Sequence, residues 1–321
     1  MIRLGIVGCA EIAFRRFMPA VQNVDGIRAV AVAEEYDPSK LQMFKDTYGL
    51  ETETKFSDLI EREDIDALYI PQPPALHFKW AQYALEHGKH VLVEKPSTLS
   101  LADTETLVKT AAEKNLALHE NYMFRYHAQI REIQSIIASG RLGEVRLIRA
   151  SFGFPLRAQN DFRYNKALGG GALLDAGGYT VKLASVLLGD TVKVDAARLY
   201  SLPGYEVDMM GSASLSDENG LTCQVGFGMD CHYQCMLEVW GSKAKLSTNR
   251  IFTAPPGFEP VAVIEDASGR DEVHLSADSH FEHSIERFVS AVSDQAVREE
   301  NYREMVLQAS LIEQIRQKNN S

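Results

Sequence analysis

The sequence predicts an α/β protein in which a doubly wound parallel sheet is followed by an α+β domain with a large, mostly antiparallel open sheet. Up to residue 121, short apolar runs alternate with helical periods, which is typical of strand–helix–strand units. Beyond it, strand patterns with apolar residues at every second position dominate. A chain of 321 residues, at roughly 150 per domain, is long enough for two domains. We therefore expect domains at residues 1–121 and 122–321.

The first domain is expected to contain five parallel strands with helices between them. Asp37 and Pro38 predict the start of the second helix, and Gly88 predicts the end of the third. Ser100, with Asp103 three residues later, resembles a capping box for the fourth helix. The first helix is expected over residues 11–24. The expected strands are residues 2–7, 28–33, 67–70, 90–93 and 116–118.

The second domain is expected to begin with an amphipathic helix and to continue as an antiparallel sheet. Asn219 and Gly220 predict a hairpin turn after a strand over residues 211–216. A further strand is expected over residues 233–239, and helices over residues 281–292 and 302–312. The face of the first helix is marked by Tyr126, Ile130, Ile133 and Ile137, and the strand after the turn by Leu221, Cys223, Val225, Phe227 and Met229.

Composition narrows the possible partners and the compartment. Hydrophobic residues make up 45% of the chain and the net charge is −11 without a basic block, so nucleic-acid binding is not expected. Charged residues interrupt every apolar stretch well short of the ~18 residues of a membrane span, so no membrane partner is expected. Four cysteines are too few for a disulfide framework, and the apolar stretch before Cys9 is too short for a secretion signal. We therefore expect a cytoplasmic protein.

A turn that could bind phosphate follows the first expected strand. In Gly8-Cys9-Ala10-Glu11-Ile12-Ala13, Gly8 permits a tight turn and Ala13 permits close packing of helix on strand. The helix N-terminus would then face the pyrophosphate of a dinucleotide. Ala10 stands where glycine is usual, and its methyl group would shift the bound pyrophosphate or weaken its binding. A plain structural turn is the alternative interpretation of this motif.

An acidic residue ends the second expected strand, where dinucleotide-binding proteins hold the ribose hydroxyls. Glu34 lies 21 residues after Ala13. A carboxylate at this place would repel a 2′-phosphate, so NAD(H) is favoured and NADP(H) is the alternative. Glu35 is interpreted as a solvated loop charge.

Five segments resemble those of a known family. Residues 88–96 (GKHVLVEKP) run a strand into Glu-Lys-Pro after a dinucleotide fold, which resembles the Gfo/Idh/MocA oxidoreductases. Pro74 stands where asparagine is common in the second segment. The other four segments are residues 71–77 (PQPPALH), 122–127 (YMFRYH), 169–179 (GGGALLDAGGY) and 238–241 (EVWG). The resemblance covers nearly the whole chain and implies a Rossmann first domain.

The resemblance also implies catalytic residues. Lys95 matches the lysine beside nicotinamide and substrate, where an ammonium can hydrogen-bond the reacting oxygen. Tyr179 stands where many members have histidine; the tyrosine form resembles glucose–fructose oxidoreductase, dihydrodiol and xylose dehydrogenases, and nucleotide-sugar ketoreductases. A tyrosine with a pKa of ~10 can donate a proton to an oxyanion. Asp175 lies four residues earlier and is expected to share the helix face of Tyr179. The alternatives are a solvated lysine and a buried core tyrosine.

Further residues are expected to contact the cofactor or the substrate. The polar segment that contains Asn160, Asp161 and Arg163 resembles one in sugar-active members and could contact hydroxyl groups or phosphates, although a solvated loop is an equal alternative. Arg125, in the crossover between the domains, is a further candidate substrate contact. The expected cofactor contacts are Gly8, Cys9, Ala10, Glu11, Ile12, Glu34, Pro71, Pro73, His77, Glu94 and Lys95.

No metal site is expected. Cys231 and Cys235 on one strand would lie ~13 Å apart at ~3.3 Å per residue, too far to share a zinc ion. His280 and His283 are three residues apart on an expected helix, and no cysteine or carboxylate pattern completes a site around them.

Together these patterns predict an NAD(P)-dependent oxidoreductase that moves a hydride between nicotinamide and a sugar or sugar-nucleotide carbonyl or carbinol. A keto-sugar reductase is favoured by family analogy. The alternatives are an aldose or trans-dihydrodiol dehydrogenase and a non-catalytic dinucleotide-binding sensor. The resemblance further implies a homodimer or homotetramer.

Overall fold

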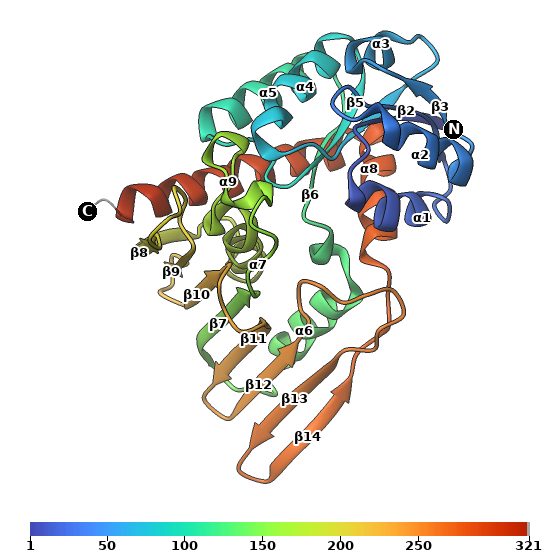
Figure 1. Cartoon of the computed structure of the whole chain (residues 1–321). Coiled ribbons are helices and arrows are strands. Elements are labelled where there is room, and N and C mark those ends of the chain that lie inside the picture. Colours follow the sequence, from blue (N-terminus) through green and yellow to red (C-terminus); the bar gives the residue numbers. More distant parts are fainter. Residues whose placement is uncertain (320–321) are drawn as a thin grey trace. The chain divides into compact units, whose positions relative to one another are not determined.

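The chain forms two compact units, which Figure 1 colours along the sequence; the computed structural model describes residues 1–319. The first unit contains Met1–Asn121 and Phe281–Ala309. The second contains Tyr122–His280 and the chain from Ser310 onward. Residues 281–309, which the sequence-based division placed in the second domain, therefore pack with the first sheet.

The first unit is built on a six-stranded parallel sheet, which confirms the predicted doubly wound fold. Its strand order is β3-β2-β1-β4-β5-β6, so the order reverses between β1 and β4. Ligands of such sheets bind at the carboxyl ends of the strands beside this reversal. The strands are β1 Ile2–Val7, β2 Ile27–Ala33, β3 Glu51–Glu53, β4 Ala67–Ile70, β5 His90–Glu94 and β6 Leu118–Asn121.

Helices cover both faces of this sheet. Leu85 of α4, Leu107 of α5 and Met305 of α9 share one buried core with side chains of the strands. Ser100 accepts a hydrogen bond from the backbone N–H of Asp103 at 3.1 Å, as the capping pattern predicts. The helices are α1 Met18–Val21, α2 Leu41–Tyr48, α3 Phe56–Glu61, α4 Pro74–Glu86, α5 Leu101–Glu113, α8 His280–Ser293 and the start of α9 Gln295–Asn319.

Four elements of this unit differ from the sequence-based prediction. The prediction missed β3 and α3, because β3 is a short polar edge strand and α3 has only six residues. It placed β6 at residues 116–118, whereas the strand is Leu118–Asn121. Most of β6 is polar yet buried, so an apolar run could not reveal it. The helix expected over residues 11–24 is π-helical over Ala13–Phe17 and ends at Val21.

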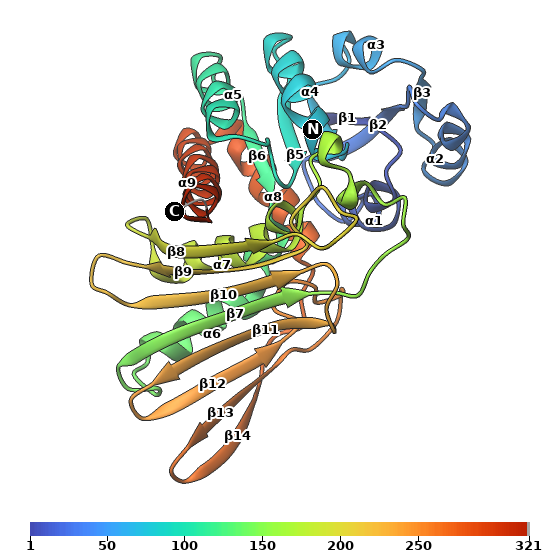
Figure 2. The same ribbon diagram turned by 60° about the vertical axis from the view of Figure 1, so that its left-hand side comes forward.

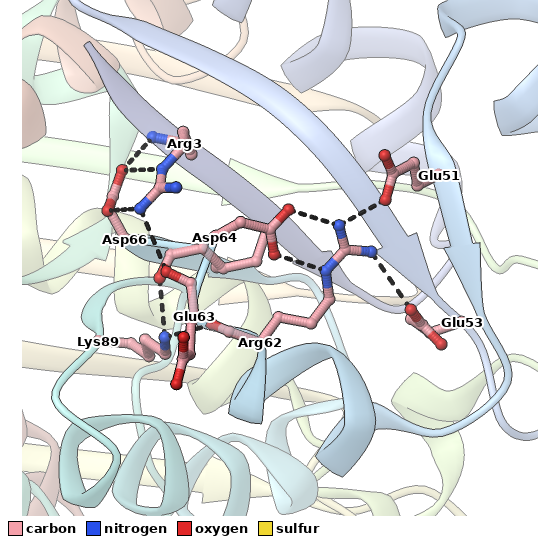
Figure 3. Close-up of polar contacts among 9 residues, drawn as sticks. Arg3, Glu51, Glu53, Arg62, Glu63, Asp64, Asp66 and Lys89 are labelled. Atoms are coloured by element: carbon pink, nitrogen blue, oxygen red, sulfur yellow. Dashed lines mark hydrogen bonds and ion pairs between the residues drawn. The ribbon is translucent and has the colours of Figure 1, made fainter.

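Two groups of ion pairs connect strands of this sheet with the loop before β4 (Figure 3). Arg3 at the start of β1 donates two side-chain hydrogen bonds to Asp66, at 2.7 and 2.9 Å. Arg62 lies between Asp64 and the carboxylates of Glu51 and Glu53 on β3. These contacts anchor the edge strand β3 to the loop between α3 and β4.

The second unit is built on an eight-stranded sheet, whose strands Figure 2 shows side by side from β8 to β14. Its order is β14-β13-β12-β11-β7-β10-β9-β8, antiparallel except for β7 beside β10. The turn at Asn219 and Gly220 joins β9 to β10 as predicted. The strands are β7 Val145–Gly153, β8 Lys193–Tyr200, β9 Met210–Ser216, β10 Thr222–Gly228, β11 Gln234–Gly241, β12 Ala244–Asn249, β13 Val261–Asp266 and β14 Gly269–His274.

Helices α6 Ala128–Ala138 and α7 Gly178–Leu188 belong to this unit, and α7 packs on β7 and β10. Cys223, Val225 and Phe227 of β10 are buried, as their alternation predicts. The last turns of α9 support the edge strand β8. Gln314 accepts a hydrogen bond from the N–H of Val194 at 3.0 Å, and Asn319 accepts one from the N–H of Leu199 at 2.7 Å.

Candidate active site

The turn after β1 requires glycine at its first position. Gly8 has a φ of 114°, and its N–H donates to the carbonyl oxygen of Ala33 at 2.9 Å. A Cβ on Gly8 would lie 1.7 Å from Nε2 of Gln72, which itself donates to the carbonyl oxygen of Val7 at 2.8 Å. The helix that follows starts with backbone N–H groups that have no partner within the helix. The turn therefore places a helix N-terminus after Gly8, which is the feature that the predicted pyrophosphate site requires.

Glu34 closes this turn with its carboxylate. The side chain is 6% exposed, and Oε2 accepts a hydrogen bond from the N–H of Cys9 at 2.8 Å. Oε1 accepts from the N–H of Tyr36 at 2.9 Å and from that of Asp37 at 3.3 Å. Burial and the charge of Glu34 raise the pKa of Cys9 to about 12, so Cys9 stays a thiol. Three backbone N–H groups thus hold the side chain of Glu34 beside the turn.

The position of Glu35 differs from its interpretation as a solvated loop charge. Its Oε1 accepts a hydrogen bond from the N–H of Phe56 at 2.8 Å, at the start of α3. It is therefore a capping group and not merely a solvated loop charge.

Buried side chains hold the segment around Lys95 on both sides. Glu94 is 8% exposed, and its Oε1 accepts hydrogen bonds from the hydroxyl of Tyr69 at 2.7 Å and from Nδ2 of Asn121 at 2.6 Å. Burial raises the pKa of Glu94, although these two bonds and the charge of Lys95 oppose the rise. Beyond Lys95, the N–H of Ser97 donates to Glu120 at 2.7 Å.

His77 lies beneath the same segment and not at its surface. It is fully buried, with Nδ1 2.7 Å from the carbonyl oxygen of Pro96 and Nε2 2.6 Å from that of Gln72. Burial lowers the pKa of His77 to about 4, so the ring is neutral at pH 7. We expected His77 to line the nicotinamide site; here its ring is fully buried and contacts the backbone of Gln72 and Pro96, next to Lys95.

Tyr179, in the second unit, lies in an aromatic cluster on α7. It is 8% exposed and makes edge contacts with Tyr122 and Phe152, with ring centroids 5.5 and 5.2 Å apart. Its hydroxyl donates to Sδ of Met123 at 3.9 Å, and thioether sulfur is a weak acceptor. The packed rings fix the side chain, so its hydroxyl can meet a stronger oxygen acceptor without first losing rotational freedom.

Asp175 belongs to an ion-pair cluster that the sequence did not reveal. Arg163 donates through Nε to Asp175 at 2.7 Å and through Nη1 to Asp161 at 3.1 Å. Burial opposes the charge of Arg163, but the two carboxylates outweigh it and raise its pKa. Asp161 and Arg163, which were expected as substrate contacts, form this cluster with Asp175. Asn160 is exposed beside them.

The glycines before α7 permit close packing. A Cβ on Gly178 would lie 2.2 Å from the hydroxyl of Tyr122, and one on Gly177 would lie 3.1 Å from the ring of Phe227. The ring of Phe227 on β10 and the hydroxyl of Tyr122 therefore leave room only for glycine at these two positions. Asp208, which no sequence pattern indicated, accepts a hydrogen bond from the N–H of Leu173 at 2.6 Å and so anchors the first turn.

Two expectations concern metals and membranes. Within residues 1–319, no three His, Cys, Asp or Glu side chains are grouped so that they could hold a metal ion. Cys231 lies before β11 and not on it, because the strand begins at Gln234, so the strand-spacing argument placed Cys231 in the wrong element. Among the helices described, none is long and apolar enough to cross a membrane.

Family models match both halves of the chain. Residues 2–122 match the oxidoreductase family with an NAD-binding Rossmann fold, and residues 130–247 match the GFO/IDH/MocA C-terminal domain. The fold and the Glu-Lys-Pro segment agree with these matches. The chain belongs to the Gfo/Idh/MocA family of NAD(P)-binding oxidoreductases, which confirms the predicted enzyme class.

The relatives include sugar-nucleotide reductases. The dTDP-3,4-didehydro-2,6-dideoxy-alpha-D-glucose 3-reductase of Saccharopolyspora spinosa is 38% identical over 98% of this chain and 97% of its own length. The enzyme of that name from Actinomadura kijaniata is 38% identical, over 98% of this chain and 95% of its own. KijD10, a 3-ketoreductase from Actinomadura kijaniata solved with NADP and TDP-benzene, superimposes with a TM-score of 0.94 at 37% identity, covering 99% of this chain and 97% of that one.

Proposed function

We propose that the protein reduces the keto group of a nucleotide-linked sugar. The observation that carries this proposal is that Lys95 and Tyr179, together with their packed surroundings, occur in a chain 38% identical over 98% of its length to a sugar-nucleotide 3-reductase. Bound nicotinamide would supply the hydride, and the Gly8 turn and Glu34 would hold the dinucleotide. Reduction then needs a proton at the carbonyl oxygen, which the chain itself must provide.

Two side chains would act on that oxygen. Tyr179, fixed by its aromatic neighbours, would donate the hydroxyl proton. Lys95, fixed through Glu94 and Pro96, would hydrogen-bond the same oxygen and stabilise the negative charge that develops there. Asp175, held by Arg163, would orient a substrate hydroxyl or the lysine. These roles are assigned from chemistry and from the family resemblance.

We propose NAD(H) as the preferred cofactor. The buried carboxylate of Glu34 lies where the adenosine ribose of a Rossmann protein binds, and a fixed negative charge there repels a 2′-phosphate. KijD10 was solved with NADP, so this preference would separate the two proteins.

The test is turnover of a substrate panel. Purified protein is mixed with NADH or NADPH and with keto-sugars, either nucleotide-linked or unlinked. Oxidation of the cofactor is followed as the loss of NADH or NADPH absorbance. We expect turnover of a nucleotide-linked ketone that Tyr179→Phe and Lys95→Ala each lower at least ~100-fold. Tyr200→Phe, at a half-exposed position on β8, is the matched control and should turn over normally.

Other results would favour other functions. Turnover restricted to NAD(P)⁺ with free aldoses would favour a dehydrogenase. A D-xylose 1-dehydrogenase (NADP(+)) of Haloferax volcanii is 30% identical over 78% of this chain. Dinucleotide binding without any turnover would favour a sensor, and failure to bind either dinucleotide would refute the proposal.

We also propose a homodimer or homotetramer in the cytoplasm, formed through the face of the eight-stranded sheet opposite α6 and α7. Tyr200 and Trp240 on this face are each 51% exposed, and a hollow of about 270 Å³ lies between β7, β8, β9 and β10. Exposed aromatic side chains on a wide sheet are typical of a surface that pairs with a second copy. Light scattering should give a dimer or tetramer that Trp240→Glu weakens; a monomer at all concentrations would exclude it.

A further inference from the structure

A line of buried polar side chains crosses the first unit and ends beside Lys95. Its members come from segments far apart in the sequence: Ser284 on α8 and Asn121 on β6 are 163 residues apart, and Asn301 on α9 and His119 on β6 are 182 apart. Ser284, Asn301, His119 and Asn121 are at most 3% exposed. None of the four takes part in the catalytic steps proposed above, so their role needs another explanation.

The hydrogen bonds along this line run without a break to Glu94. Nδ2 of Asn301 lies 3.2 Å from Nδ1 of His119, and Nε2 of His119 lies 3.0 Å from Oγ of Ser284. Ser284 donates to Oδ1 of Asn121 at 2.8 Å, and Asn121 donates to Oε1 of Glu94 at 2.6 Å.

The single hydroxyl hydrogen of Ser284 sets the direction of the whole line. Since that hydrogen is donated to Asn121, Oγ must accept the hydrogen of Nε2 of His119. Nδ1 of His119 is then the acceptor for the amide of Asn301. Arg287 extends the line to a cation, because its Nε donates to Oδ1 of Asn301 at 3.0 Å. Every donor therefore points from the guanidinium towards the carboxylate.

We propose that this line, which we call the Ser284 network, is a positioning network that holds the buried carboxylate of Glu94 in place and thereby fixes the surroundings of the Lys95 amine. The proposal rests on the catalytic role proposed for Lys95. Aligned hydrogen bonds polarise one another in a low dielectric, so each donation strengthens the next. Burial alone would favour the neutral acid at Glu94, which raises its pKa, and the donation from Asn121 opposes that effect.

Other titratable groups also contact Glu94 or the backbone next to Lys95. Tyr69 on β4 donates to the same carboxylate oxygen. His77 on α4 contacts the carbonyl of Pro96, and Glu120 on β6 accepts from the N–H of Ser97. Replacement of Ser284 removes no contact of these three residues. A change in the labelling of Lys95 in that variant would therefore come from the Ser284 network.

The test measures the reactivity of the Lys95 amine without substrate or cofactor. Full-length protein is labelled briefly with acetic anhydride between pH 6 and 11, and the modified fraction of Lys95 is read by mass spectrometry. In Ser284→Ala, Asn121 loses one partner and holds the Glu94 carboxylate less firmly, so we expect labelling of Lys95 at pH 8 to rise about 3- to 10-fold. Ser290→Ala, at an exposed position on the same helix, is the matched control and should label like the wild type.

Turnover gives the second readout. If Lys95 acts as an ammonium, the basic limb of the pH profile of kcat should move to lower pH in Ser284→Ala, with KM unchanged. Ser284→Thr should restore the wild-type profile. Arg287→Met, at the half-buried end of the network, should give a smaller shift in the same direction if Ser284→Ala does not fold. Identical labelling curves for the wild type and the folded variants would overturn the proposal. A wild type that turns over no keto-sugar would refute the proposed function, and the labelling would still test the network.

Discussion

Glu34 is the residue on which the proposed cofactor preference rests, and three backbone N–H groups fix its carboxylate. A fixed charge interacts with a bound phosphate more strongly than a mobile, solvated one. The neighbouring Glu35 carries the same charge but is used to cap α3. The two glutamates therefore form a natural pair for comparison.

We expect Glu34→Gln to tighten NADPH binding about tenfold relative to NADH. The amide keeps the size of the side chain and removes the repulsion of the 2′-phosphate. A tenfold change in relative affinity corresponds to about 1.4 kcal/mol. Fluorescence titration with both dinucleotides measures the ratio. Glu35→Gln should leave the ratio unchanged; an equal response of the two variants would mean that position 34 does not face the ribose.

Arg163 should be needed for both stability and turnover. Its replacement by methionine leaves Asp161 and Asp175 as neighbouring buried carboxylates without their cation, which costs about 3 kcal/mol of unfolding free energy. With Asp175 no longer held, we expect kcat to fall at least ~10-fold. Urea denaturation and turnover measure the two effects. Asp161→Asn keeps the pair of Arg163 with Asp175, so a loss as large in that variant would contradict the assigned role.

At the scale of elements, the sequence predicted the helices, strands and turns that depend on neighbouring residues in the chain. Gly8, Ser100 and the turn at Asn219 determine backbone geometry within a few residues, and the structure confirms all three elements. The sequence could not reveal β6, because His119 and Asn121 find their partners on α8 and α9, more than 160 residues away. The bonds of Asp208 and Arg163 likewise exist only after tertiary packing. Local sequence patterns therefore predicted part of the candidate site, but not the buried residues that hold its side chains in place.

The ion pairs of β3 should make acid stability depend on Arg62 (Figure 3). The hydrogen bond from Arg62 lowers the pKa of Asp64 to about 2. A lowered folded-state pKa stabilises the protein above the unfolded value of ~3.9, and this stabilisation is lost as the pH falls towards 2. We expect Arg62→Met to lower the unfolding free energy at pH 7 by about 1 kcal/mol, since Asp64 is half exposed. The deficit should shrink between pH 4 and 2.

Chemical denaturation at a series of pH values measures that deficit. Arg15→Met removes one exposed pair with Glu11 and should show no deficit at any pH. A deficit for Arg62→Met that stays constant down to pH 2 would show that packing, and not charge, is lost.

At the scale of the whole molecule, the two units use the end of the chain differently. Tyr302 and Met305 of α9 belong to the core of the first unit, whereas Gln314 supports β8 in the second. The helix therefore has one segment for each unit. Shortening the chain at two places separates the two roles.

A chain that ends after Ala309 should still bind dinucleotide, because the first unit keeps all its residues. A chain that ends after His280 should lose binding and cooperative unfolding, because it lacks Ser284, Tyr302 and Met305. Dinucleotide titration and thermal unfolding followed by circular dichroism measure both. Equal binding by the two shortened chains would show that α8 and α9 are dispensable for the first sheet.

The return of residues 281–309 to the first sheet also has a consequence during synthesis on the ribosome. When Asn121 leaves the exit tunnel, all six strands of the first sheet exist, but the partners of His119 and Asn121 have not yet been translated. Every strand of the second sheet is translated before those partners appear. The half of the protein made first therefore receives its last partners only after every strand of the second sheet has been made, and its edge at β6 stays open for most of translation.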